Sequence, residues 1–201
     1  SAFFASQPVV DRFGKAVFHE CLLRLRGEDG ALVPAGEFIP AVETLGLHAA
    51  VDAYVIARVL TELAAHPAIR LSCNVSSLSL AEPGFRADIE ARVARAPREA
   101  PRLIIEITET AALPEDREIV ACLSRLRAAG VRLALDDFGA GFTSLRHLTI
   151  LPLDIVKLDG KLVRGMGEST RSAAIVRTVI ELAAQFGFAL VPNQIARATR
   201  A

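Results

Sequence analysis

The first 25 residues show the pattern of a β-hairpin. Residues 7–11 form a largely apolar run, and residues 12–15 (Arg-Phe-Gly-Lys) supply a turn that contains glycine. Residues 16–25 then alternate between apolar and polar positions as a strand does. The sequence therefore predicts two antiparallel strands at the start of the chain.

Beyond the hairpin, apolar positions recur at helical spacing, and short apolar runs follow them. The pattern predicts a helix around 51–63 before strand 69–75, helix 85–96 before strand 102–108, helix 116–129 before strand 131–135, and strand 155–158 followed by helix 171–186 and strand 188–191. Gly130 and Gly187 fall where helix C-caps are expected, and Pro114 with Glu115 and Asp116 indicates a helix N-terminus. This repeated alternation predicts a parallel sheet covered by helices.

The predicted strands are apolar, which indicates burial on both faces in a doubly wound sheet or a closed barrel. Polar residues nevertheless occur at or near the carboxyl ends of different strands: Glu20, Asn74, Glu106, the pair Asp136 and Asp137, and Lys157 in a fifth strand. Active sites of α/β barrels are assembled from such strand ends. We therefore expect an α/β barrel, and residues 1–201 contain no linker that would divide them into two domains.

Composition narrows the classes of ligand and the compartment. The 201 residues carry no formal net charge, so we expect a small ligand held by local cations and neither a nucleic-acid polymer nor contact of this domain with a membrane. No apolar stretch is long enough to span a bilayer. Cys21, Cys73 and Cys122 are odd in number and show no metal-binding spacing, which predicts buried thiols in the cytoplasm. The sequence leaves open whether this domain is the cytosolic part of a longer membrane-anchored protein.

The strand-borne acids predict a metal site. Buried carboxylates are costly unless they are paired or bind a metal, and no matching set of strand-borne arginines accompanies them. Carboxylate and amide oxygens suit Mg²⁺, Mn²⁺ or Ca²⁺, and the lack of nearby His or Cys argues against zinc. Adjacent Asp136 and Asp137 would suit two metal positions. For Asp137 and Glu109, a role in capping a helix or closing a loop is the alternative.

Several motifs in order along the chain resemble those of the EAL domain family, the cyclic di-GMP phosphodiesterases and their degenerate receptor relatives. Residues 20–24 (Glu-Cys-Leu-Leu-Arg) are similar to the family signature, with Cys21 where the family has alanine. The other matching segments are 7–11 (Gln-Pro-Val-Val-Asp), 38–40 with Glu43 and 46–47, 74–76 (Asn-Val-Ser), 106–109 (Glu-Ile-Thr-Glu), 136–145 (Asp-Asp-Phe-Gly-Ala-Gly-Phe-Thr-Ser-Leu) and 157–159 (Lys-Leu-Asp).

The resemblance implies a fold and a set of roles. The fold would be a modified TIM barrel with an antiparallel first strand. The metal ligands would be Glu20, Asn74, Glu106, Asp136 and Asp137, with Mg²⁺ or Mn²⁺ as cofactor and Ca²⁺ as an inhibitory ion. The catalytic residues would be Glu20, Lys157 and Asp137, with Lys157 positioning water or phosphate. The ligand cyclic di-GMP would meet Gln7, Arg24, Pro40 and Asp159, and Glu109 would support the loop of residues 138–144.

The last part of the chain departs from the family pattern. Where the family has a catalytic glutamate and a second acid, this chain has Asn193 and Ala196. Asparagine cannot act as a base or supply negative charge to a metal. The chain also stops at Ala201, before the family's last strand and helix, so we expect an open barrel edge. Two alternatives remain. The barrel is completed in a longer protein with partner domains, or a second copy of the chain covers the open edge in a homodimer.

Three functions remain in contention. The first is a degenerate domain that binds cyclic di-GMP and acts as a receptor or regulator in bacterial signalling. The second is a metal-dependent phosphodiesterase that hydrolyses the cyclic dinucleotide to linear pGpG, favoured by the polar residues that remain. The third is a protein-interaction scaffold without a ligand.

Overall fold

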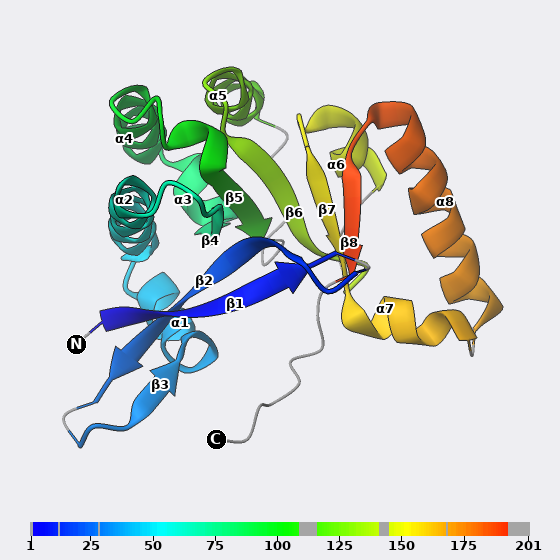
Figure 1. Cartoon of the computed structure of the whole chain (residues 1–201), viewed down its shortest axis with the longest axis horizontal. Helices are drawn as coiled ribbons and strands as arrows, with labels where there is room; N and C mark the ends of the chain where they lie inside the picture. The colour runs from blue at the N-terminus through cyan, green and yellow to red at the C-terminus, as the bar shows by residue number, and fades with distance from the viewer. Residues whose placement is uncertain are drawn as a thin grey trace.

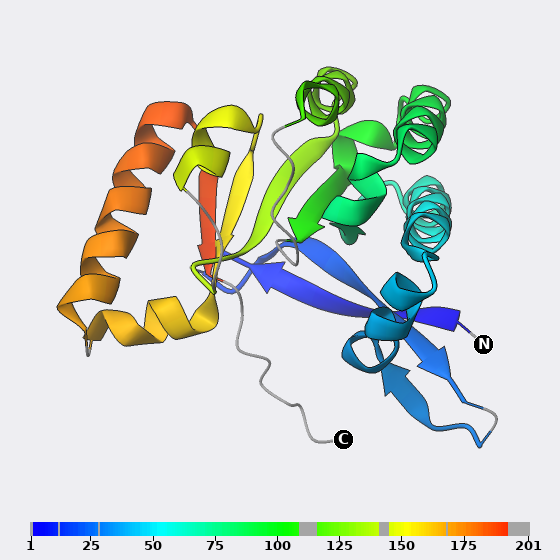
Figure 2. The same cartoon turned by 180° about the vertical axis from the view of Figure 1, so that it is seen from behind.

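The computed structural model describes residues 2–11, 13–27, 29–108, 116–140, 145–167 and 169–192. A curled sheet forms its centre, and helices cover the outer side of that sheet (Figures 1 and 2). The strands are β1 (Ala2–Val10), β2 (Ala16–Arg26), β3 (Leu32–Pro34), β4 (Leu71–Ser76), β5 (Leu103–Thr108), β6 (Arg132–Phe138), β7 (Ile155–Leu158) and β8 (Ala189–Pro192). The helices are α1 (Ala35–Thr44), α2 (His48–Ala65), α3 (Ser77–Ala81), α4 (Pro83–Ala94), α5 (Arg117–Ala128), α6 (Leu145–Ile150), α7 (Gly160–Arg164) and α8 (Thr170–Phe186), with 3₁₀ turns η1 (Ala100–Arg102) and η2 (Gly165–Gly167).

The sheet has the order β1-β2-β4-β5-β6-β7-β8, with β3 paired to β2 beside this path. The β1–β2 and β2–β3 pairs are antiparallel, and every later pair from β2–β4 to β7–β8 is parallel. This confirms the predicted α/β barrel architecture with an antiparallel first strand. Within the described ranges β1 and β8 are the two ends of the path, so the sheet is a partial barrel.

Alternation along the strands separates an outer core from the barrel interior. Because successive side chains of a strand point to opposite faces, residues two apart lie on one side of the sheet. One small cluster of buried apolar residues fills the interior: Val9, Phe18, Ile104, Ala134 and Ile155, with Val191 packed against it. The residues two positions later on β2, β5, β6 and β7 are Glu20, Glu106, Asp136 and Lys157. An apolar layer therefore lies directly beneath a charged layer.

The larger core lies between the sheet and the helices. It contains Cys21, Cys73 and Cys122, which are buried free thiols, as predicted. Burial is the largest effect that raises the pKa of Cys21 to about 11, so this thiol stays protonated at neutral pH and is a poor nucleophile. No helix in the parts of the chain that the structure describes has the length and apolar character needed to cross a bilayer.

Local chemistry explains where several elements begin and end. The carboxylate of Asp11 accepts hydrogen bonds from Phe13 N and Lys15 N and so closes the hairpin turn between β1 and β2. Asp116 caps α5 by accepting from the backbone N–H of Glu118. Gly187 has φ 79° at the C-cap of α8, the left-handed conformation that favours glycine. Pro114 and Glu115 lie outside the described residues.

Asp52 links α2 to the start of α3 and should make stability depend on pH. It accepts hydrogen bonds from Ser76 N (2.9 Å) and Ser79 Oγ (2.6 Å). Burial raises its pKa from 3.8 to about 6, and the two hydrogen bonds offset only part of this rise. Since the folded-state pKa lies above the unfolded value, the stability linked to Asp52 is fully present below about pH 4 and is lost as the pH rises through about 6.

We expect Asp52→Asn to remove this dependence, because asparagine keeps an acceptor oxygen but does not ionise. The difference in unfolding free energy between wild type and variant should change by up to about 3 kcal/mol between pH 4 and pH 7. Urea unfolding at a series of pH values measures it. A difference that stays constant over that range would contradict the assignment.

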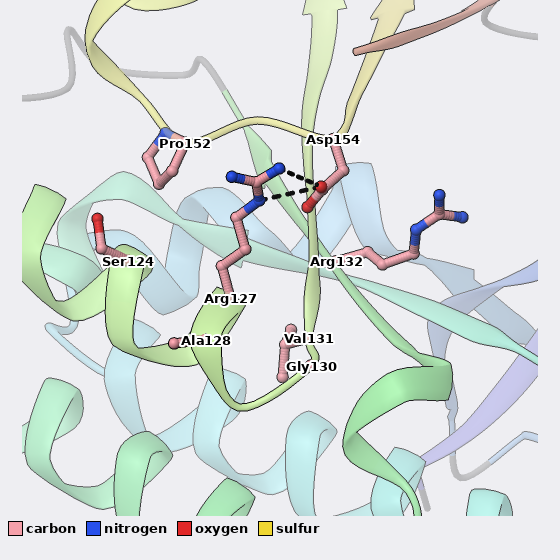
Figure 3. Close-up of a pocket in the computed structure, with 8 residues that line it drawn as sticks. All are labelled: Ser124, Arg127, Ala128, Gly130, Val131, Arg132, Pro152 and Asp154. Atoms are coloured by element: carbon pink, nitrogen blue, oxygen red, sulfur yellow. Dashed lines mark hydrogen bonds and ion pairs between the residues drawn. The ribbon is translucent and has the colours of Figure 1, made fainter. Parts of the chain in front are cut away.

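Asp154 ties the amino ends of three strands to α5. Its carboxylate accepts from Arg127 Nε and Nη2, both at 3.0 Å (Figure 3). It also accepts from Leu133 N at 3.0 Å. Its backbone carbonyl accepts from Ala189 N at 2.8 Å. These contacts line a hollow of about 500 Å³ at the end of the sheet opposite to the charged layer. We interpret this hollow as a structural junction, because both oxygens of the Asp154 carboxylate accept hydrogen bonds from the protein.

Asp154→Ala is expected to lower the free energy of unfolding by about 1–3 kcal/mol, because it leaves the Leu133 N–H without its acceptor and Arg127 without its carboxylate. Glu181→Ala, an acid-to-alanine change on the exposed side of α8, is the matched control and should change stability by less than about 0.5 kcal/mol. Chemical denaturation of both variants provides the comparison. If Asp154→Ala and Glu181→Ala had equal free energies of unfolding, the Asp154 contacts would contribute nothing to stability.

Candidate functional site

Five neighbouring strands each contribute a polar side chain to one cluster in the barrel interior. Following the order of the sheet, they are Glu20 on β2, Asn74 on β4, Glu106 on β5, Asp136 on β6 and Lys157 on β7. Asn74 and Glu106 are register partners in the parallel β4–β5 pair, so they lie side by side. The strands hold these residues rigidly because apolar side chains fill the interior layer below and the outer core behind.

Lys157 lies at the centre of the cluster. Its Nζ is 3.0 Å from Glu20 Oε2, 2.6 Å from Glu106 Oε2 and 3.2 Å from Asp136 Oδ1. The lysine side chain is only 2% exposed and that of Glu106 is fully buried, so water screens these ion pairs little. One ammonium group therefore joins three carboxylates from three strands.

The cluster also offers oxygen atoms suited to a divalent metal. Ligand oxygens of Glu20, Glu106 and Asp136 all lie within 4.8 Å of one another. The amide of Asn74 donates to Glu20 Oε1 at 3.1 Å, which fixes its orientation. Glu106 Oε1 and Asn74 Oδ1 are buried and accept no hydrogen bond from any residue in the described ranges. Buried acceptors without donors are costly, and a hard cation with oxygen ligands would satisfy both.

Burial dominates the pKa values of the acids. It raises the pKa of Glu106 from 4.5 to about 7, although the Lys157 ammonium acts in the opposite direction. The pKa of Asp136 is also raised, first by burial, with Lys157 again opposing. Burial alone would lower the pKa of Lys157, but the surrounding carboxylates outweigh it and raise that pKa above its ordinary value. The site therefore holds a protonated lysine among acids that favour a further positive charge.

A cavity of about 200 Å³ gives access to the cluster between the two ends of the sheet. Its lining includes Gln7, Glu20, Asp136 and Lys157. Gln7 is the register partner of Glu20 across the β1–β2 pair, which places this predicted ligand contact beside the carboxylates. The cavity is smaller than the hollow near Asp154, but it borders the charged layer, whereas that hollow does not.

Apolar lining residues of this cavity were missed by sequence reasoning, namely Pro8, Val9, Leu22, Val191 and Pro192. Leu22 could have been predicted as a lining residue from the sequence, since it lies two residues after Glu20 and must share its face of β2. Val191 and Pro192 could not have been predicted in this way, because only the curvature of the sheet brings β8 towards β1.

Asp137 differs from the buried acids although it directly follows Asp136. It is exposed and is not among the residues whose ligand oxygens converge. Its backbone has φ 55°, which is unusual for a residue with a side chain, and its N–H donates to Asp136 Oδ1 at 3.0 Å. This turn helps to orient Asp136. The predicted second metal position at Asp137 stays a prediction.

The other predicted ligand contacts lie on nearby elements. Arg24 follows Glu20 and Leu22 on the same face of β2, and its Nη1 donates to Leu23 O at 2.9 Å. Asp159 follows β7 and uses Oδ1 to cap α7, accepting from the backbone N–H groups of residues 161 and 162. Pro40 is exposed within α1 and does not line the cavity.

Some predictions fall on parts of the chain that the structure leaves undescribed. Glu109, predicted to support the loop, and residues 141–144 of that loop lie outside the described residues. So do Asn193 and Ala196. In the described part of the loop, Gly139 has φ 97°, and a Cβ there would lie 2.5 Å from Leu162 Cδ2. The backbone angle therefore favours glycine at this position, and a side chain there would displace the end of Leu162.

Comparison with known proteins identifies relatives over nearly the whole chain. The EAL domain family model matches residues 2–201. Cyclic di-GMP phosphodiesterase PdeF of Escherichia coli K12 is 32% identical over 185 residues, covering 90% of this chain and 25% of PdeF. An uncharacterized protein of Mycobacterium bovis is 32% identical over 213 residues, covering 97% of this chain and 69% of that protein. The chain thus spans about a quarter of the length of PdeF.

Solved structures give the same result. The PaMucR phosphodiesterase in complex with c-di-GMP superimposes with a TM-score of 0.83 at 26% identity, covering 98% of this chain and 82% of that one. The FimX EAL domain from Pseudomonas aeruginosa, bound to c-di-GMP, gives 0.81 at 26% identity, covering 98% and 81%. With a family match along residues 2–201 and a carboxylate cluster on the strands that carry the motifs, the chain belongs to the EAL domain family.

Proposed function

We propose that this chain binds cyclic di-GMP at the carboxyl ends of its strands, together with one divalent cation, and acts as a receptor or regulator. The observation that carries the proposal is the buried cluster of Glu20, Asn74, Glu106 and Asp136, in which two oxygens have no donor within the described residues. Such a cluster has little structural use, since apolar residues of similar volume would serve a barrel interior at least as well.

Mg²⁺ or Mn²⁺ is the proposed cofactor, because both prefer oxygen ligands of this kind. The ion would supply positive charge to a phosphate of the ligand. Arg24 would hold a phosphate through its planar guanidinium, and Gln7 would contact the ligand beside Glu20. Asp159 would use the carboxylate oxygen that does not cap α7. Pro40 would contact the ligand from α1, at a point outside the cavity.

Loss of two acids favours a receptor over an enzyme. In the sequence, Asn193 and Ala196 occupy the positions where the family resemblance expects glutamates. An amide cannot take a proton from water at neutral pH, nor can it neutralise a second metal ion. Among the described residues, Asp137 is the adjacent acid that could help to hold a second ion, but it is exposed and is not in the group whose ligand oxygens converge.

A metal-dependent phosphodiesterase is the second candidate, and two observations favour it. The cluster keeps four oxygen-bearing residues together with Lys157, which is more than ligand retention alone requires. PdeF, a relative with 32% identity, is named as a cyclic di-GMP phosphodiesterase. In that case the chain would yield linear pGpG.

Incubation of the chain with cyclic di-GMP and Mg²⁺ or Mn²⁺, followed by chromatography of the products, separates the two candidates. The receptor proposal expects the cyclic dinucleotide to remain intact over hours. Formation of pGpG by wild type but not by Glu20→Ala would overturn it in favour of the phosphodiesterase. Asn193→Glu is the informative second variant, because a gain of pGpG formation would identify the missing acid as the cause of inactivity.

A further inference from the structure

Lys157 has an unusual setting for a lysine. It is among the largest side chains in the described part of the protein that are fully buried. Lysine is rarely buried without a specific partner, and this one has three, on β2, β5 and β6. Its ammonium reaches across the interior from β7, so it connects strands that are not neighbours in the sheet.

On Glu106, the ammonium and the proposed metal would use different oxygen atoms. Lys157 contacts Oε2 of Glu106, whereas Oε1 of the same carboxylate has no donor among the described residues. On Glu20, the lysine contacts Oε2, and the amide of Asn74 donates to Oε1. Asn74 Oδ1 is again without a donor in that part of the chain. The two cations therefore need not compete for one position.

Charge sets a limit on how many metal ions such a site holds. Three ionised carboxylates and one ammonium leave an excess of two negative charges, which one divalent ion neutralises. A second divalent ion would need further acids nearby. Within the described ranges Asp137 is the adjacent acid that could supply one, and asparagine at position 193 of the sequence adds no negative charge.

We propose that Lys157 is a resident cation of this site, which holds the three carboxylates together before metal binds and stays among them when a single divalent ion binds through the remaining oxygens. Before metal binds, the ammonium offsets the repulsion between acids whose oxygens lie within 4.8 Å. After metal binds, it fixes the capacity of the site at one ion. The inference rests on the proposed metal site and adds to it an order of events and a stoichiometry.

The first test observes the ammonium of wild type directly. In ¹⁵N-labelled protein, a buried and ion-paired lysine ammonium exchanges its protons slowly and gives a resolved NMR signal, which Lys157→Met assigns by its absence. Titration with Mg²⁺ alone should shift this signal without removing it, and calorimetry should give one ion per chain. Loss of the signal at saturation, or two ions per chain, would overturn the inference. Absence of any Mg²⁺ binding would instead refute the proposed metal site.

The second test removes the charge. Lys157→Met should unfold at a temperature lower by roughly 5–15 °C in the absence of metal, because it leaves buried acids uncompensated. It should also bind Mn²⁺ at least about tenfold more tightly, since a positive charge next to the ion has gone. Lys161→Met, an exposed lysine on α7, is the matched control and should change neither value.

An unchanged unfolding temperature of Lys157→Met, or weaker Mn²⁺ binding, would contradict the resident role. Recovery of folded Lys157→Met only in the presence of Mn²⁺ would support it, because the ion would then replace the missing charge. If the variant cannot be recovered in either condition, the NMR titration of wild type still decides the inference.

Discussion

Glu106→Gln is expected to lower the affinity for Mg²⁺ or Mn²⁺ at least about 100-fold, since loss of an outer-shell partner alone costs 10–100-fold. Glu106 is fully buried, gives Oε2 to Lys157 and leaves Oε1 for the ion. Glutamine keeps the shape but removes the charge, and its NH₂ group would point a donor at one of the two cations. Calorimetric titration with each metal measures the change.

Glu90→Gln provides the matched control for this exchange. Glu90 lies on α4 and pairs with Arg125 on the outer surface, away from the cluster. Its replacement should leave metal affinity unchanged. Metal affinity of Glu106→Gln within a fewfold of wild type, in protein that unfolds at a normal temperature, would show that this carboxylate is not a ligand.

Arg24→Met is expected to weaken cyclic di-GMP binding by roughly 10–150-fold, the range that loss of a hydrogen bond to a charged group produces. Arg24 shares its face of β2 with Glu20 and Leu22, and Leu22 lines the cavity. Methionine keeps the apolar stem but removes the guanidinium. Because Arg24 is outside the metal cluster, Mg²⁺ affinity should stay the same.

Arg58→Met is the control, since Arg58 lies on α2 and pairs with Glu62 on the outer side of the sheet. It should bind the dinucleotide as wild type does. Calorimetry or fluorescence titration compares the variants at one salt concentration. Equal ligand affinities for Arg24→Met and wild type would remove the proposed phosphate contact, and a parallel loss of Mg²⁺ binding would show that the change damages the cluster itself.

The pattern of apolar residues predicted the architecture. The strands are apolar on both faces, because one face packs against the helices and the other lines the barrel interior. The hairpin, the parallel strands and the convergence of Glu20, Asn74, Glu106 and Asp136 all follow from strand ends that meet at one edge of a sheet. Boundaries were less predictable. β1 begins at Ala2, well before the predicted start at residue 7, because pairing with β2 continues to Leu25. An apolar segment without alternation gives no sign of such pairing.

Short helices escaped prediction for a related reason. α3, α6 and α7 have five or six residues each, too few for a helical period to appear in the sequence. Their formation depends on local caps and tertiary contacts. Asp159, for example, was predicted as a ligand contact, and the structure also makes it the N-cap of α7. The cap uses Oδ1, so a ligand contact through Oδ2 would be compatible with it.

The ion pairs of Lys157 could not be derived from the sequence. Its strand was predicted, and a role near water or phosphate followed from the family resemblance, but its contacts with Glu20 and Glu106 depend on how the sheet curls. For Asp137, in contrast, the sequence suggested a role that the structure does not place in the buried group. The pair Asp136 and Asp137 suggested two metal positions, whereas only Asp136 joins the buried group in the described residues.

The most direct test of the account is a calorimetric titration of the chain with cyclic di-GMP, performed with Mg²⁺ and again after its removal, with the recovered nucleotide checked for hydrolysis. A receptor that uses Mg²⁺ should show saturable binding that weakens without Mg²⁺, with the cyclic dinucleotide recovered intact. Absence of binding at saturating concentrations in the presence of Mg²⁺ would contradict it.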